Sequence, residues 1–432
     1  MLTREYPVWL GKDLQARSTH LIVLFKYNRS IPMDKYDHLD FYQTDLLLTH
    51  EEREIRDTVR RFVDQECMPI IADYFDKGSF PMDLIPQMAQ LGLFGVHVEG
   101  YGCRNRSHMI YGIICKELAR CDSGLRAMFS VQNSLVMFPV FKFGSEAQRE
   151  KWLPTMARGK AIGCFGLSEP DYGSNPAGMQ TRAINKDGQF ILNGKKMWIT
   201  NGTIADVAVI WARLDDEIRG FLVETRTAGF RATPIQNKFS YRTSPTAYID
   251  LKDCIIPEDS ILPGAKGLKA VFRCLNHARY GVACGALGSA IACFQEARGF
   301  ALKRKVFDQP IASYQLVQDQ LARMLVEITK AQLVSYHLGR MLDEHRAGPA
   351  QISLAKLNNV REAIKIARIA RDILGARGIL ADHHIIRHLC DLEAISTLEG
   401  TAGMHTLVLG QEITGISAFK STEDRGQMPE NR

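Results

Sequence analysis

The sequence predicts an α+β protein in which helices and strands occupy separate stretches of the chain. Apolar residues recur at helical spacing from about Glu51 to Arg158. From Gly163 to Leu262 short apolar runs alternate with turns rich in Gly and Pro, and from Leu268 to about Phe419 helical spacing returns. Segregated runs of this kind favour α+β layering over a doubly wound α/β sheet.

The first zone is expected to contain several helices in succession. Helical spacing is clear at 109–119 and again at 125–141. Asp122 and Ser123 lie between these two stretches, and both residue types are favoured as N-caps. We therefore expect one helix to end and the next to begin at this point.

The middle zone reads as an all-β module of about 100 residues. Asn193-Gly194 is a turn pair that predicts a hairpin after Phe190 and Leu192. Three further short strands are expected at 207–211, 220–224 and 247–251.

The last zone is long and helical. Gly281, Gly285 and Gly288 lie on one side of a predicted helix. No strand precedes them, so close helix packing is favoured over phosphate binding.

Composition excludes several classes of protein. The chain has 432 residues, of which 46% are hydrophobic and 24% charged, and a formal charge of +6 with no block of Lys and Arg typical of a nucleic-acid site. None of the ten cysteines forms a CxxC pair, which favours a reducing compartment. No run is long enough for a membrane span.

Residues 1–46 are interpreted as an N-terminal extension. Its first forty residues mix acids with bases, whereas mitochondrial presequences are poor in acids. A bacterial cytoplasmic protein is therefore the first expectation and a mitochondrial matrix protein the alternative.

Two clusters in the β module carry chemistry-bearing residues. The segment 164–175 combines hydroxyls and glycines in a turn that can approach a phosphate or polar ring. The segment 193–202 places Trp198 two residues before Thr200, so both are expected on one face of a strand, where they can bind a flat ring. Taken singly, each cluster is more often a turn beside a core tryptophan.

A third cluster, 396–401, contains Glu399 followed by Gly400, which is expected to end a helix. An acid beside an apolar residue can have its pKa raised by desolvation. Taken singly, such a glutamate is usually a solvated surface acid. His383, His384 and His388 are interpreted as packing or surface groups rather than a metal site, because no acidic or cysteine ligand pattern accompanies them.

Taken together, the three clusters resemble the acyl-CoA dehydrogenase family over Leu47 to Phe419. The motifs that carry the resemblance are Gly166-Leu167-Ser168-Glu169-Pro170 with Gly173-Ser174, Met197-Trp198-Ile199-Thr200-Asn201, and Glu399-Gly400-Thr401. Within the family the chain looks most like the glutaryl-CoA dehydrogenases. The stretches that carry this likeness are 122–126, 130–137, 163–167, 276–281 and 413–419.

The resemblance implies a helical N-terminal domain, a β-barrel-like middle domain and a C-terminal four-helix bundle. The expected boundaries are 47–160, 161–264 and 265–432. It also implies FAD bound between the last two domains, a homotetramer, electron-transfer flavoprotein as acceptor, and a role in lysine and tryptophan degradation.

The resemblance also implies roles for single residues. Glu399 is the expected catalytic base. The expected substrate-binding residues are Arg126, Ser130, Ser174, Asn276, Arg279 and Gly400. The expected FAD-binding residues are Phe165, Leu167, Ser168, Gly173, Ser174, Trp198, Thr200, Arg377 and Thr401, with Arg304 and Phe307 reaching the FAD of a neighbouring subunit.

The resemblance implies that Arg126 receives the distal carboxylate of a dicarboxylate substrate, and a guanidinium can bind a carboxylate through two parallel hydrogen bonds. A structural arginine paired with a local acid is the alternative. In the reaction that the resemblance implies, Glu399 takes an α-proton from glutaryl-CoA and a β-hydride passes to flavin N5.

Some positions depart from the family pattern. Ala119 and Leu398 replace the glutamate and tyrosine of glutaryl-CoA dehydrogenases that decarboxylate, which predicts slow or absent loss of CO2. Val306, Asp308, Ala376 and Gly403 replace usual residues at the dinucleotide end, which predicts weaker FAD binding. A dehydrogenase of another short, branched or unusual acyl-CoA and a catalytically silent flavin-fold scaffold remain alternatives.

Overall fold

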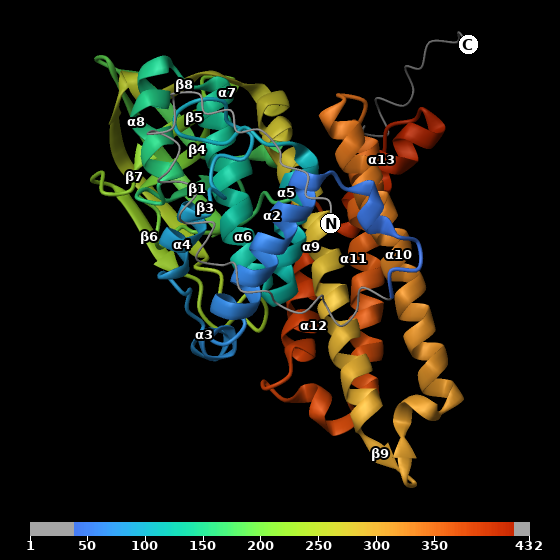
Figure 1. Ribbon diagram of the computed structural model, residues 1–432. Coiled ribbons are helices and arrows are strands. Elements are labelled where there is room, and N and C mark those ends of the chain that lie inside the picture. The colour runs from blue at the N-terminus through green and yellow to red at the C-terminus, as the bar shows by residue number, and fades with distance from the viewer. Residues whose placement is uncertain (1–38, 419–432) are drawn as a thin grey trace, which may run out of the picture. The chain divides into compact units, whose positions relative to one another are not determined.

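The computed structural model describes residues 39–418 (Figure 1). The chain divides into two units, 1–42 and 43–432, and the second contains every element discussed below. Most of the expected N-terminal extension, residues 1–38, lies outside the described residues, and so does Phe419 at the end of the expected helical zone.

Seven α-helices form the first part of the described chain. They are α2 (His50–Phe62), α3 (Ile71–Lys77), α4 (Leu84–Gln90), α5 (His108–Cys121), α6 (Ser123–Ser130), α7 (Phe138–Phe143) and α8 (Glu146–Ala157). Asp122 caps α6, as expected: its Oδ1 accepts from the backbone N–H of Gly124 at 2.8 Å and of Leu125 at 3.2 Å. The helix expected over 125–141 is divided, because a π-helical segment, Val131–Met137, separates α6 from α7.

Eight strands form one sheet in the middle of the chain. They are β1 (Gly163–Gly166), β2 (Arg182–Lys186), β3 (Gln189–Ile199), β4 (Val207–Leu214), β5 (Glu217–Glu224), β6 (Phe230–Pro234), β7 (Ala247–Pro257) and β8 (Ile261–Lys266). Their order is β6-β7-β3-β2-β4-β5-β8, and β1 pairs with β4 in parallel beside the end of β2.

The expected hairpin at Asn193-Gly194 is wrong. β3 continues through this pair, and Gly194, at φ 154°, pairs with Leu251 of β7 after a register shift. The turn lies instead at Asp187 and Gly188 between β2 and β3, where both residues have positive φ. Asn-Gly is therefore a bulge in this chain, and Asp-Gly supplies the hairpin.

The sheet is apolar on both faces. Along β4, Val207, Val209 and Trp211 belong to the large core shared with the N-terminal helices. Ala208 and Ile210 alternate with them and pack in a separate core with β3, β5 and β7. The face of Val207, Val209 and Trp211 therefore packs against the N-terminal helices, which include α6 with Arg126.

The last part of the described chain is a bundle of long helices. They are α9 (Gly267–Lys303), α10 (Gln315–Asp343), α11 (Pro349–Ile373), α12 (His384–Ile395) and α13 (Ala402–Thr414), with a short ribbon of β9 (Lys305–Val306) and β10 (Gln309–Pro310) after α9. Figure 1 shows α9 to α12 side by side; α9 and α11 contact each other, and each of them contacts both α10 and α12. No helix in residues 39–418 is long and apolar enough to cross a membrane.

Glycines on α9 allow α5 to approach closely, as expected. A Cβ at Gly288 would lie 2.0 Å from the carbonyl oxygen of Lys116, and one at Gly281 would lie 2.6 Å from the hydroxyl of Tyr111. This contact between α5 and α9 joins the N-terminal helices to the C-terminal bundle.

Candidate active site

Glu399 lies in the loop between α12 and α13. The expectation that Gly400 ends a helix is wrong: α12 ends at Ile395, and Thr401 caps α13 by accepting from the N–H of Met404 at 3.1 Å. Glu399 has a left-handed backbone, with φ 55°, which is uncommon for a residue other than glycine. A backbone held in this conformation often belongs to a functional site.

Gly400 is required by its surroundings. Its φ is 104°, and a Cβ there would lie 2.9 Å from Nε2 of His405. Any larger residue would therefore displace the loop that carries Glu399.

Two cations, the buried Lys356 and the half-buried Arg279, hold this loop by its carbonyl oxygens. Lys356 of α11 donates from Nζ to the carbonyls of Leu398 at 2.5 Å and Gly400 at 2.6 Å. Arg279 of α9 donates from Nε to the carbonyl of Glu399 at 2.8 Å. Sequence reasoning missed Lys356, because a lysine in an amphipathic helix gives no signal that its ammonium group is buried.

The carboxyl group of Glu399 is left without a partner at one oxygen. Oε2 is buried and accepts no hydrogen bond. Burial raises the pKa of Glu399, while the positive charges of Arg126, Lys356 and Arg279 act in the opposite direction. Such a group is suited to take up a proton.

Arg126 of α6 is 1% exposed. It donates from Nη2 to the hydroxyl of Tyr241 at 2.5 Å, and its Nε has no partner. Within residues 39–418 no ion pair joins Arg126 to an acid, so the local acid of the alternative interpretation is not found there. The positive charge of Arg126 nonetheless lowers the pKa of Glu399. Burial acts to lower the pKa of Arg126 itself, but Tyr241 and Glu399 act against burial, and the pKa of Arg126 is raised.

On the side of its Nε, Arg126 faces residues without polar side chains. A Cβ built on Gly285 would lie 3.2 Å from Nε of Arg126 and 3.4 Å from Cβ of Ala119. Ala119, Gly285 and Arg126 therefore meet at one place, and two of the three offer no polar side chain.

Hydroxyl groups line the neighbouring wall. Tyr111 is within hydrogen-bond distance of Ser130, at 2.8 Å, and its hydroxyl accepts a second bond from the hydroxyl of Ser134, also at 2.8 Å. The pKa of Tyr111 is raised well above its ordinary value, first by burial and also by the charge of Glu399. Tyr111 and Tyr241 were both missed, because buried tyrosines usually indicate only core packing. Asn276, in turn, accepts from Nη1 of Arg279 at 3.3 Å.

A second group of expected residues lies at the ends of β1 and β3. Phe165 and Leu167 are buried, and Ser168 accepts at its carbonyl from the N–H of Met197 at 2.9 Å. Trp198 is 59% exposed, with φ 64° at a bulge in β3. The alternation expected for Trp198 and Thr200 does not apply, because the bulge interrupts it and β3 ends at Ile199.

The remaining expected residues belong to other segments of the chain than the Glu399 loop. Gly173 and Ser174 are in an exposed loop. Arg304 and Phe307 follow the end of α9, where Lys303 is 24 residues beyond Arg279, or roughly 36 Å along the helix. Arg377 is at the same end, with its guanidinium 6.0 Å from the ring centroid of Phe300.

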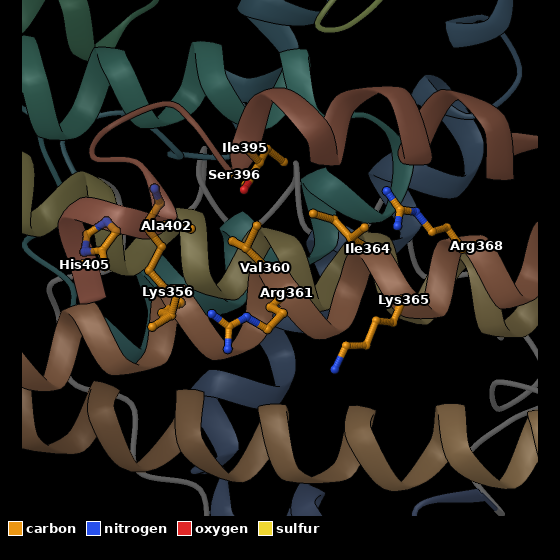
Figure 2. A pocket seen from close by; sticks show the side chains of 11 residues that line it. Lys356, Val360, Arg361, Ile364, Lys365, Arg368, Ile395, Ser396, Ala402 and His405 are labelled. Atoms are coloured by element: carbon orange, nitrogen blue, oxygen red, sulfur yellow. The ribbon is translucent and has the colours of Figure 1, made fainter. Parts of the chain in front are cut away.

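A cavity of about 210 Å³ lies beside the Glu399 loop, between α11 and the ends of α12 and α13 (Figure 2). Lys356, Ser396, Ala402 and His405 line the side nearest the loop, and Arg361 lines the α11 side. Neither Glu399 nor Arg126 contributes to its lining. The cavity thus borders the back of the loop, and Lys356 connects it to the candidate base.

Models of the acyl-CoA dehydrogenase family match most of the chain. The N-terminal domain matches residues 49–160, the middle domain 164–254 and the C-terminal domain 265–414. The chain belongs to the acyl-CoA dehydrogenase family.

Relatives in this family differ in their substrates. The human mitochondrial short-chain specific acyl-CoA dehydrogenase is 32% identical over 86% of this chain and 92% of its own length. Glutaryl-CoA dehydrogenase of Desulfococcus multivorans is 30% identical over 86% of this chain and 98% of its own. A crystal structure of glutaryl-CoA dehydrogenase from Mycobacterium smegmatis in complex with FADH2 is 48% identical, with a TM-score of 0.87 over 88% of this chain and 99% of that one.

Family membership confirms two predictions. The fold class is α+β, with a helical part, a sheet and a second helical part, and the enzyme class is an oxidoreductase acting on CH–CH groups. The domain boundaries and the roles of single residues stay predictions.

Proposed function

We propose that this acyl-CoA dehydrogenase oxidises glutaryl-CoA with FAD as its cofactor and Glu399 as its base. Two observations together carry the proposal. Glu399 has a buried carboxyl oxygen without a hydrogen-bond partner, and Arg126 has a buried guanidinium without an ion pair. A substrate that has an acidic α-hydrogen at one end and a carboxylate at the other would satisfy both groups.

The residues at the ends of β1 and β3 fit a flavin ring. Trp198 offers an exposed aromatic face, and the backbone of Phe165 and Leu167 with the Ser168 hydroxyl provides polar groups nearby. These residues, with Thr200, Gly173, Ser174 and Thr401, would hold FAD. When bound, FAD accepts the hydride. The 48% identical structure in complex with FADH2 supports this assignment.

Glu399 begins the reaction. Its carboxylate takes the α-proton of the thioester, so the α C–H bond breaks and the proton ends on Glu399, while the β C–H bond breaks with its electron pair leaving as hydride. The backbone N–H of Glu399 polarises the thioester carbonyl as negative charge develops on its oxygen. Lys356 and Arg279 fix the loop so that carboxylate and N–H keep their positions.

Arg126 selects the substrate by binding its distal carboxylate. Nε has no partner, and the guanidinium can present two parallel donors to one carboxylate. Ser130 lies one helical turn further along α6 and shares the contact. Asn276, Arg279 and Gly400 border the thioester end.

The product is expected to keep its CO2. Ala119 lies next to Arg126, and Leu398 precedes the base, so neither position offers the polar group found in decarboxylating relatives. Glutaconyl-CoA should therefore accumulate with the purified enzyme, as measured by mass spectrometry. Abundant crotonyl-CoA would contradict this part of the proposal alone.

Further assignments follow from the family. Electron-transfer flavoprotein is the proposed electron acceptor, and the assembly is a homotetramer in which Arg304 and Phe307 reach the FAD of a neighbouring subunit, while Arg377 contacts FAD at its dinucleotide end. Their distance from Glu399 within one chain supports that arrangement. The proposed setting is lysine and tryptophan degradation in a bacterial cytoplasm, or alternatively in a mitochondrial matrix.

An anaerobic titration of the FAD-loaded enzyme tests the proposal. Glutaryl-CoA should bleach the flavin absorption in stoichiometric amounts, with a higher rate than butyryl-CoA or isovaleryl-CoA. Faster bleaching by either monocarboxylic substrate would replace glutaryl-CoA by that substrate class. No bleaching by any of the three would contradict the assignment of an active dehydrogenase and favour a silent scaffold.

A further inference from the structure

Three histidines outside the candidate active site gather at one point. His97 lies in the loop after α4, His108 begins α5, and His277 lies on α9. The ring centroids are 4.5 Å apart for His97 and His108, and 5.1 Å apart for each of the other two pairs. One nitrogen of each ring lies within 4.8 Å of the others, and within residues 39–418 no other group of His, Cys, Asp or Glu side chains meets this geometry.

The three rings have nitrogens to spare. His108 uses Nδ1, which lies 3.0 Å from Oδ1 of Asp343, so its Nε2 is left for another partner. Nε2 of His97 and Nδ1 of His277 are buried and have no hydrogen-bond partner. Buried polar atoms without a partner are rare in native proteins, so two of them at one point indicate a ligand.

Asp343, the last residue of α10, is itself firmly held. Its Oδ1 accepts from the backbone N–H of His108 at 2.5 Å, and its Oδ2 from that of Met109 at 3.4 Å. A carboxylate bonded to one nitrogen of a histidine fixes the tautomer and the direction of the other nitrogen. Histidines that bind metals usually have such a partner.

We propose that His97, His108 and His277 bind a divalent transition-metal ion of the Zn²⁺ class, with Asp343 orienting His108. Imidazole is a preferred ligand of these ions, and three histidines leave a fourth position for water. Zn–N bonds of about 2.0–2.1 Å place ligand nitrogens of a tetrahedral site roughly 3.3 Å apart, so modest ring rotations close the site. Burial lowers the pKa of both His97 and His277, which keeps the rings in the neutral form that binds metal.

The surroundings favour a metal over an anion. Phe138, whose ring centroid is 4.1 Å from that of His277, and Tyr111, 5.1 Å from His97, close two sides with aromatic surface. The bound ion would join a loop of the N-terminal part to α5, α9 and α10. Tyr111 also bonds Ser130 and Ser134 at 2.8 Å, so the metal site would support the wall of the candidate active site without touching Glu399.

Metal binding can be measured without any acyl-CoA, so its outcome is separate from that of the proposed function. The FAD-loaded full chain would be stripped with a chelator and dialysed to equilibrium against Zn²⁺. We expect one tightly bound zinc per chain, with three imidazole nitrogens at about 2.0–2.1 Å by X-ray absorption at the zinc edge. Zinc should also raise the melting temperature.

Variants separate this site from other histidines. His108→Asn and His277→Asn should each abolish tight binding, and Asp343→Asn should weaken it by roughly 10–100-fold. His383→Asn is the matched control, because His383 also bonds a carboxylate, Glu296, at 2.6 Å but has no histidine pair beside it with spare nitrogens. Circular dichroism would establish that each variant is folded.

Three results would overturn the proposal. The first is zinc uptake by the wild-type enzyme no greater than that of the doubly substituted His108→Asn, His277→Asn chain. The second is an X-ray absorption spectrum of the wild type without imidazole ligands, and the third is loss of the bound zinc from His383→Asn. Each would leave His97, His108 and His277 as stacked packing groups. The X-ray absorption measurement uses only the unmodified chain, so it decides the matter even if a variant does not fold.

Discussion

Two glutamates with buried carboxyl oxygens, Glu169 and Glu399, have opposite environments in this enzyme. Glu169, in the turn after β1, accepts from the N–H of Gln180 at 2.6 Å and of Thr181 at 2.9 Å. It also accepts from the Thr181 hydroxyl at 2.5 Å and from Nζ of Lys196 at 2.9 Å. Glu399, in contrast, has a buried oxygen with no partner, although three cations lie around it.

The difference appears in the two pKa values. Burial acts to raise both pKa values. At Glu169 the charge of Lys196 and the hydrogen bonds to the carboxylate outweigh burial, so the pKa of Glu169 is lowered. At Glu399 burial wins, and the pKa is raised. A carboxylate with all its partners stabilises the fold, whereas one that lacks a partner is suited to take up a proton. The first environment fits a structural residue, and the second fits the role of base that we propose for Glu399.

The largest expected effect is on catalysis at Glu399. Glu399→Gln keeps the shape of the side chain but removes its basicity, so kcat should fall by about 10³–10⁴-fold. Flavin content and melting temperature should stay close to those of the wild type, because no partner of Oε2 is lost. Stopped-flow reduction of the flavin by glutaryl-CoA measures the rate; activity within tenfold of wild type would remove Glu399 as the base.

The opposite pattern is expected at Glu169. Glu169→Gln leaves the Lys196 ammonium, which is 0% exposed, without its counter-charge, and should cost about 3 kcal/mol of stability. Thermal unfolding of the flavin-loaded enzyme measures this loss of stability, and the Glu399→Gln variant, measured in the same way, is the control. Adding Lys196→Met should recover much of it, because the unpaired charge is gone. Equal melting temperatures for the two glutamine variants would remove the contrast between the sites.

A smaller effect is expected on substrate choice. Arg126→Met should lower kcat/KM for glutaryl-CoA by about 10²-fold, the effect of losing a charge-assisted pair at a buried site. The rate with butyryl-CoA, which has no distal carboxylate, is the internal control and should change much less. A parallel loss with both substrates would mean that Arg126 supports the fold rather than the specificity.

The sequence predicted the elements better than the geometry that makes the site work. Helical spacing and capping at Asp122 were sufficient for the helices around it, because local rules act there. The left-handed backbone of Glu399 and the bulge at Trp198 were not predictable, since contacts with Lys356, Arg279 and β7 impose them. Residues distant in sequence supply those contacts, and no pattern within one segment reports them.

The histidine cluster illustrates the same limit. The adjacent His383 and His384 attracted notice because they are close in sequence, yet they bond Glu296 and Arg387. His97, His108 and His277 come from three separate elements, and only packing of α5 against α9 brings them together. Spacing along the sequence therefore gave no signal for the cluster of His97, His108 and His277.

The smallest effect concerns the pH dependence of the base. Glu399 acts in its ionised form, so kcat/KM should rise with pH through a raised pKa, above the ordinary value for glutamate of about 4.3. The positive charge of Lys356 lowers the pKa of Glu399, so Lys356→Met should move this inflection to higher pH by about one unit. Burial lowers the pKa of Lys356 itself to about 7. Above neutral pH the wild-type Lys356 therefore loses its positive charge and no longer lowers the pKa of Glu399.

Lys365→Met is the matched control for this shift. Lys365 is on the same helix and lines the same cavity, but its ammonium is paired with Glu362 at 2.8 Å and does not reach the Glu399 loop. Its profile of kcat/KM against pH should coincide with that of the wild type. Coincidence of the Lys356→Met profile as well would mean that this lysine acts only through the carbonyls of Leu398 and Gly400, by holding the loop, and that its charge does not tune the base.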